Sequence, residues 1–381
     1  AWGSAGFPWL LLGFSQIDTP LKYLMPVIGV YGTGFLACLA ATFLAIGIGH
    51  QNIWRHVWVL AFIAILMTPL ALKNKEWSLI QKEPVSVGII QANLSMRDKW
   101  DESFFWELLQ YYHNAINGLT GKVKLIVMPE SAIPLPTSYI REIIDNLHTK
   151  AKSFKSGILL GMLQSSEHDA NQYHNAMVAL GTAKGAYLKQ QLVPFGEFIP
   201  ALFKTIIDWL GIPVANIVPG KAPQDLITIG NHPIASLICY ELAYPSVLRQ
   251  QMPKAQWIVS ISDDGWFGHS LAMYQQVQMA QVLSVLTARY QIVANNDGLS
   301  SIINPKGEVV ASLPAMRSGI LTADIYPASG TSPWIQWGDT PIVLLCLLLI
   351  FAFSIHRHFT SNEANSPIAA KHKRRYPYQP N

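Results

Sequence analysis

The sequence predicts an α/β domain flanked by transmembrane α-helices. Of its 381 residues, 50% are apolar and only 13% are charged, whereas soluble domains carry about 25% charged residues. Uncharged apolar stretches lie near both ends of the chain. Between them, short β-rich runs alternate with amphipathic helical runs, which is typical of sheets covered by helices. Apolar content this high also excludes a disordered chain.

Residues 1–83 are predicted to form a membrane region. Residues 24–49 exceed the roughly 20 residues that a helix needs to cross the hydrocarbon core. Residues 57–72 are shorter, and we expect them to pair with the first span as a helical hairpin. The opening segment 7–23 is apolar and aromatic but is interrupted by two prolines and an aspartate. This predicts an interfacial or re-entrant segment.

A further transmembrane helix is predicted within residues 331–355. Trp334 and Trp337 precede its uncharged stretch and suggest an interfacial aromatic belt. Residues 356–381 form a basic tail, whereas the rest of the chain is neutral. Because Lys and Arg favour the cytoplasmic side, we expect a cytoplasmic tail and a body on the periplasmic side of a bacterial membrane. A neutral body also argues against nucleic-acid binding.

Residues 84–330 are predicted to form the α/β domain. Helices are expected at 101–119, with Asp101 as N-cap, and at 142–151 and 271–290. A hairpin is expected over 300–310 around the turn 304–307. The expected strands are 85–91, 124–128, 157–163, 175–180, 234–239, 257–262, 292–295 and 319–325.

Several strand-like runs end in a polar group. Glu130, Cys239 and Asp263 each follow an apolar run, and Lys189 precedes a loop that contains Pro and Gly. Ligands bind beyond the carboxyl ends of strands in open α/β sheets, so these groups are expected to converge.

A cysteine nucleophile needs a base for its proton and a donor for the oxyanion that forms. Glu130 can act as the base and Lys189 as the donor, helped by a backbone N–H near Tyr240. Taken singly, each has a structural interpretation: a solvated strand-end glutamate, a surface lysine and an inert buried thiol. The three cysteines have no spacing that suggests a disulfide framework or a zinc site.

Four motifs follow one another along the chain. They are Met128-Pro-Glu130-Ser-Ala, Lys189-x-x-Leu-Val-Pro-Phe-Gly-Glu197, Ile238-Cys239-Tyr240-Glu241 and Asp264-Gly-Trp-Phe-Gly268. In this order they resemble the Glu-Lys-Cys nitrilase superfamily and, more narrowly, its membrane-embedded branch, the apolipoprotein N-acyltransferases. The family's pattern begins with further spans before Phe7, so we expect this chain to correspond to its C-terminal three quarters.

The resemblance implies a nitrilase-like αββα sandwich and a two-step acyl transfer. Cys239 would attack the sn-1 ester of a phospholipid, with Glu130 as general base and Lys189 holding the oxyanion. The resulting thioester would then acylate the α-amine of a diacylglyceryl-cysteine apolipoprotein. The resemblance suggests a monomer in the bacterial inner membrane with no metal and no cofactor.

The resemblance also implies supporting residues. Glu197 and Glu241 would orient Lys189 and the active-site loop. Tyr240, Trp266 and Phe267 would line the acyl path. Trp100 would sit on an arm near the entrance, although a helix-start aromatic packed on the body is an equal interpretation.

Two acids depart from the family's pattern. Asp263 and Asp297 stand where amides are expected, and either could raise the pKa of Cys239 by adding negative charge. An Asp263→Asn variant with an unmoved pH–rate profile would dispose of this hypothesis.

Two other functions stay open. A membrane-tethered amidase or nitrile hydrolase would use the same triad with water as acceptor. A non-enzymatic lipoprotein-binding module would keep its function in a Cys239→Ala variant.

Overall fold

The structure is a computed structural model that describes residues 8–99, 101–136, 139–166, 169, 171–200, 203 and 216–364. The chain divides into two compact units, residues 1–338 and 339–381. The second unit contains α10 (Thr340–Ala364), which includes a stretch apolar and long enough to cross a membrane.

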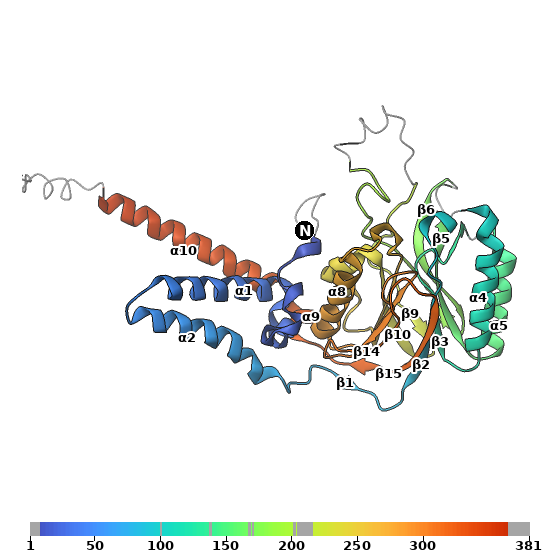
Figure 1. The fold of residues 1–381 in the computed structure, drawn as a ribbon, viewed down its shortest axis with the longest axis horizontal. Helices are drawn as coiled ribbons and strands as arrows, with labels where there is room; N and C mark the ends of the chain where they lie inside the picture. Colours follow the sequence, from blue (N-terminus) through green and yellow to red (C-terminus); the bar gives the residue numbers. More distant parts are fainter. Residues whose placement is uncertain are drawn as a thin grey trace, which may run out of the picture. The chain divides into compact units, whose positions relative to one another are not determined.

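The first unit begins with short 3₁₀ helices at Pro8–Leu10, Phe14–Asp18 and Pro20–Leu24. They lead into α1 (Met25–Gly49), and α2 (Trp54–Met67) runs back beside it before a 3₁₀ turn at Thr68–Leu72 (Figure 1). Together with the adjoining 3₁₀ turns, the two helices form the stretches Pro20–Gly49 and Trp54–Leu72, which are apolar and long enough to cross a membrane.

The described part of the segment predicted as interfacial is packed on the body. Its Phe14, Ile17 and Leu21 are buried, and the 3₁₀ helices contact α8 (Ala272–Thr287). Trp334 of α9 (Pro333–Trp337) is also buried, at 1% exposure, whereas Trp337 is 60% exposed. The prediction that Trp334 belongs to an aromatic belt was wrong, because its indole fills the core of the body.

Within the described residues, two large mixed sheets form the body. The first runs in the order β14 (Val309–Ser312), β13 (Ser301–Ile303), β12 (Gln291–Asn295), β11 (Trp257–Ser262), β10 (His232–Ile238), β9 (Ile227–Ile229) and β7 (Ala183–Lys184). The second runs in the order β15 (Gly319–Ile325), β2 (Val85–Gln91), β3 (Leu125–Val127), β5 (Gly157–Ser165), β6 (Tyr173–Gly181) and β8 (Ala186–Leu188), with β4 (Ile133–Pro136) beside β5. A short pair joins β1 (Leu79–Ile80) to β16 (Ala328–Ser329).

The sheets pack face to face between helices. Ile89 of β2 points into the core shared with the other sheet, whereas its neighbour Ile90 points toward α4 (Phe105–Leu119) and α5 (Arg141–Ser153). This alternation is the period-2 geometry of a strand that is buried on both faces. On the other side, α7 (Pro245–Gln251) and α8 cover the first sheet (Figure 1). The predicted αββα sandwich is confirmed.

The prediction that Asp101 caps the helical run 101–119 is confirmed, although a 3₁₀ turn precedes the α-helix. The Asp101 carboxylate accepts hydrogen bonds from the N–H and hydroxyl of Ser103 and so caps a short 3₁₀ helix, Glu102–Phe104. The residue that precedes α4 itself is Phe104.

Candidate active site

Glu130 lies just after β3 and is 6% exposed. Its Oε1 accepts hydrogen bonds from Asn175 Nδ2 at 2.6 Å and Lys189 Nζ at 3.2 Å. Its Oε2 accepts one from the N–H of Asp263 at 3.1 Å. Gly161 of β5 permits this placement, because a Cβ there would lie 2.7 Å from Glu130 Cα. The carboxylate is therefore held from three sides.

Lys189 follows β8 and is 1% exposed. Its ammonium also donates to Glu197 Oε1 at 2.9 Å. Burial alone would lower the pKa of Lys189, but the charges of Glu130 and Glu197 outweigh it and raise this pKa above its ordinary value. Lys189 is thus a fixed cation that cannot act as a base at neutral pH.

Glu197 is the second carboxylate that contacts Lys189. Its Oε1 accepts from Asn175 Nδ2 at 2.9 Å, and its Oε2 accepts from the N–H of Val193 at 2.8 Å. Asn175 therefore bridges the two carboxylates that flank the lysine.

Cys239 lies at the end of β10 and opens a 3₁₀ helix, Cys239–Ala243. Its φ of 52° belongs to a region that residues with a Cβ rarely adopt, and such strain is common at functional sites. Sγ lies 4.0 Å from Gln276 Nε2 of α8. Burial and then the charge of Glu130 raise the pKa of Cys239, while Lys189 lowers it. The thiol is therefore protonated at rest and needs a base before it can attack.

Glu241 is fully buried two residues beyond Cys239. Its Oε1 accepts from the N–H groups of Gln190 and Gln191 at 2.7 and 3.1 Å, and its Oε2 accepts from the N–H of Ile238 at 2.8 Å. Burial raises the pKa of Glu241 to about 7. This carboxylate ties the loop after Lys189 to the strand end that carries the thiol.

Trp9 brings together an aromatic cluster that includes Tyr240, the residue after Cys239. The Trp9 ring stacks on Tyr240 at 6.4 Å between centroids and packs on Phe267 at 5.5 Å. Phe267 is half-buried against the core, whereas Trp266 is 76% exposed. The two residues predicted as a pair thus differ in their surroundings. Trp100 lies outside the described residues.

A second group of acids lies beside Glu130. Asp263 is ion-paired with the buried Lys99, whose ammonium also donates to the backbone oxygen of Glu130 at 2.9 Å. Asp264 accepts from Asn295 Nδ2 at 2.7 Å, and burial raises its pKa to about 8. Burial also raises the pKa of Asp297, to about 6.

These contacts bear on the hypothesis about the two departing acids. After burial, the carboxylate that contributes most to the raised pKa of Cys239 is Glu130, followed among the acids by Asp264 and Glu197. The negative charge of Asp263 faces Lys99 instead.

Sequence reasoning missed Asn175, Lys99, Gln276 and Trp9. Asn175 is a polar residue inside an apolar strand run, and Lys99 precedes the Trp100 position that was considered. Their partners are distant in sequence, so only folding brings them to the site.

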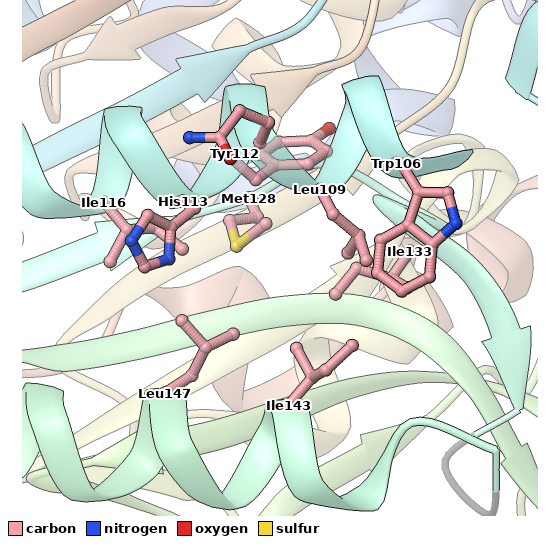
Figure 2. A pocket seen from close by; sticks show the side chains of 10 residues that line it. Trp106, Leu109, Tyr112, His113, Ile116, Met128, Ile133, Ile143 and Leu147 are labelled. Atoms are coloured by element: carbon pink, nitrogen blue, oxygen red, sulfur yellow. The ribbon is translucent and has the colours of Figure 1, made fainter. Parts of the chain in front are cut away.

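A cavity of about 240 Å³ lies elsewhere, between α4 and α5 (Figure 2). Leu109 and Ile143 face it from the two helices, and His113 and Trp106 also line it. None of the residues predicted at the active site does. Among the described residues, no group of three or more His, Cys, Asp or Glu side chains could hold a metal ion.

Comparison with known proteins shows the family to which this chain belongs. The family model described as carbon-nitrogen hydrolase matches residues 86–333, and the model described as apolipoprotein N-acyltransferase N-terminal domain matches residues 1–43. The apolipoprotein N-acyltransferase of Coxiella burnetii is 31% identical over 352 residues, which cover 91% of this chain and 72% of that protein. The chain belongs to the apolipoprotein N-acyltransferase family.

Other relatives agree with this membership. The apolipoprotein N-acyltransferase of Pseudomonas putida is 31% identical over 356 residues, which cover 92% of this chain and 70% of that protein. Among solved structures, a carbon-nitrogen hydrolase from Helicobacter pylori G27 is 14% identical with a TM-score of 0.49, covering 64% of this chain and 89% of that chain. The family resemblance predicted from the four motifs is confirmed.

Proposed function

We propose that this protein transfers a fatty acyl chain from the sn-1 position of a membrane phospholipid to the N-terminal amine of diacylglyceryl-cysteine in bacterial apolipoproteins. The observation that carries this proposal is the electrostatic effect of Glu130 and Lys189 on the Cys239 thiol, in a chain that belongs to this family. Both charges act on the pKa of the thiol, and Lys189 Nζ lies 3.2 Å from Glu130 Oε1.

In the first step, Glu130 takes the thiol proton as Sγ of Cys239 bonds to the carbonyl carbon of the sn-1 ester. The Lys189 ammonium stabilises the negative charge on the carbonyl oxygen. The ester C–O bond then breaks, Glu130 returns the proton to the departing lysophospholipid oxygen, and a thioester remains on Cys239.

In the second step, the lipoprotein amine attacks the thioester carbon. Glu130 accepts the amine proton, the C–S bond breaks, and that proton returns to the thiolate. Glu197, Glu241 and Tyr240 act as supporting residues in this scheme, with Trp266 and Phe267 along the acyl path. The same groups serve both steps, so the cycle ends with the enzyme as it began.

We further propose a monomer with α1, α2 and α10 in the bacterial inner membrane. The body would face the periplasm and the basic tail the cytoplasm. The three apolar helices support this arrangement, and both substrates are anchored in the same bilayer. An impermeant thiol reagent should then label Lys122→Cys, but not Arg55→Cys, in intact spheroplasts of a background without the native cysteines.

The function is tested by incubating the detergent-purified chain with phosphatidylethanolamine and a synthetic diacylated lipopeptide. We expect a triacylated lipopeptide from the wild type and from Cys346→Ala, a matched control in α10, and none from Cys239→Ala. Release of free fatty acid or hydrolysis of small amides without transfer would favour the amidase alternative. No transfer by the wild type, together with lipopeptide binding that is unchanged in Cys239→Ala, would favour a binding module.

A further inference from the structure

A basic cavity of about 210 Å³ lies where the α1–α2 hairpin meets the body. Lys22 comes from the 3₁₀ helix before α1, and Lys73 and Lys75 come from the segment after α2. Lys306 comes from the turn between β13 and β14. Glu76 is the acid that lines the same space. Three segments distant in sequence thus bring four ammonium groups together.

No ion pair joins these four lysines to a carboxylate within the part of the chain that the structure describes. Two of them lie over aromatic rings instead: Lys22 over Tyr23 at 5.5 Å and Lys75 over Trp77 at 5.7 Å. Four lysines and one glutamate line the cavity, which leaves three positive charges in excess (4 − 1 = 3), so an anion in the cavity would be attracted to it.

Contacts with α8 hold the turn that carries Lys306 at the edge of the cavity. Gln281 of α8 donates to the backbone oxygen of Gly307 at 2.7 Å, which holds the turn that carries Lys306. Gly307 has φ 77°, and a Cβ there would lie 2.7 Å from Val285 Cγ2. The turn therefore needs glycine to approach α8 this closely.

The position of the cavity relative to the apolar spans indicates which kind of anion it binds. The apolar spans begin at Pro20 and end at Leu72, next to Lys22 and Lys73, so the cavity lies at the depth of lipid head groups. Tyr and Trp side chains at this depth are typical of membrane interfaces. In the orientation proposed above, these lysines face the periplasm, against the usual bias of basic residues. The positive-inside bias therefore does not explain these lysines, whereas a bound anion does.

We propose that this lysine cavity binds the phosphate of an anionic phospholipid head group, such as that of phosphatidylglycerol. A zwitterionic head group is disfavoured because it would bring its own ammonium among the lysines. The inference rests on the membrane insertion of α1 and α2 and is independent of acyl transfer at Cys239.

The test compares two triple variants of the full chain in detergent. Lys73→Gln/Lys75→Gln/Lys306→Gln removes the exposed lysines of the cavity. The control, Lys122→Gln/Lys152→Gln/Lys184→Gln, removes three exposed lysines elsewhere on the body and lowers the net charge equally. Each protein is titrated with short-chain phosphatidylglycerol, with phosphatidylethanolamine of the same chains, and with inorganic phosphate, and the rise in Tm is recorded.

We expect phosphatidylglycerol to raise the Tm of the wild type and the control at lower concentration than phosphatidylethanolamine does. Each basic residue near an anionic surface strengthens binding about fivefold, so the cavity variant should need roughly 100-fold more phosphatidylglycerol at low salt. Equal weakening in the control, or no preference for the anionic lipid, would overturn the proposal. A cavity-dependent rise with inorganic phosphate alone would show a free-phosphate site instead. Acyl transfer is measured separately, so its failure would be distinguishable from failure here.

Discussion

Two acidic clusters lie on either side of the Glu130 carboxylate, and they differ in how their charge is balanced. In the first, Lys189 lies between Glu130 and Glu197, at 3.2 and 2.9 Å from their Oε1 atoms. In the second, Lys99 pairs with Asp263, but burial raises the pKa of Asp264 to about 8 and that of Asp297 to about 6. The first cluster is built on two ion pairs to one lysine, whereas in the second burial favours the protonated form of Asp264.

The two clusters differ in the partner that each buried carboxyl group has. Glu130 and Asp264 are both buried, at 6% and 0% exposure. Lys189 donates directly to Glu130, whereas the amide of Asn295 donates to Asp264. The carboxylate proposed as the base for Cys239 therefore lies beside a cation, whereas burial raises the pKa of Asp264.

The largest effect is expected from Lys189→Met. It leaves the buried Glu130 and the half-buried Glu197 without the cation between them, which should cost about 3–5 kcal/mol of stability and abolish acyl transfer. Thermal unfolding of the purified variant measures the first effect. The double variant Lys189→Met/Glu197→Gln should recover part of the lost Tm, because one of the two carboxylates is gone. A Lys189→Met protein as stable as the wild type would contradict the importance of these two ion pairs.

Lys99→Met should also lower the stability of the protein, but by less than Lys189→Met does. It leaves Asp263 buried without its partner, while Lys99→Met/Asp263→Asn removes both charges. A double-mutant cycle on Tm should show a coupling of about 1–3 kcal/mol. Additive losses in the cycle would show that the two residues act separately.

Asp264 predicts a pH dependence of stability. Its folded pKa of about 8 exceeds the ordinary value of 3.8, so between these values the folded state holds a proton that the unfolded state has lost. Stability should therefore fall as pH rises from about 4 to about 8, and fall no further from this cause above that range. Asp264→Asn should flatten this part of the Tm profile. An unchanged slope would mean that Asp264 is ionised in the folded protein.

Asp297→Asn is the matched test with the smallest expected effect. The pKa of Asp297 rises from 3.8 to about 6, so its contribution to the slope ends about two pH units earlier than that of Asp264. The variant should change the slope of the Tm profile only below about pH 6 and leave a constant offset above it. A change of slope confined to higher pH would reverse the ranking of the two aspartates.

Apolar periodicity predicted the longer elements well. Val85–Gln91, Trp257–Ser262 and Gly319–Ile325 are strands with the predicted bounds, because each is an uninterrupted β-rich run. The two-residue strand Ala183–Lys184 carries no such signal. It exists because the neighbouring strand Ile227–Ile229 offers hydrogen bonds, which the sequence does not display.

The sequence pointed to the motif residues of the candidate site but not to their partners. Glu130 and Cys239 follow apolar runs and Lys189 precedes a loop with Pro and Gly, which are local patterns. Asn175 lies within a strand, and its role as a bridge between Glu130 and Glu197 depends on strand pairing. Trp9 lies in the segment read as interfacial, although it stacks on Tyr240 more than two hundred residues later. Such contacts depend on tertiary packing and leave no local pattern.

The central claim is that Cys239 carries the acyl group. Its most direct test is mass spectrometry of the peptide containing Cys239 after incubation of the purified chain with phosphatidylethanolamine. We expect a fatty-acyl adduct that hydroxylamine removes, that a diacylated lipopeptide discharges, and that is absent from Cys239→Ala. Formation of the triacylated lipopeptide with no adduct on Cys239 at any time point, including single-turnover samples without acceptor, would contradict the account.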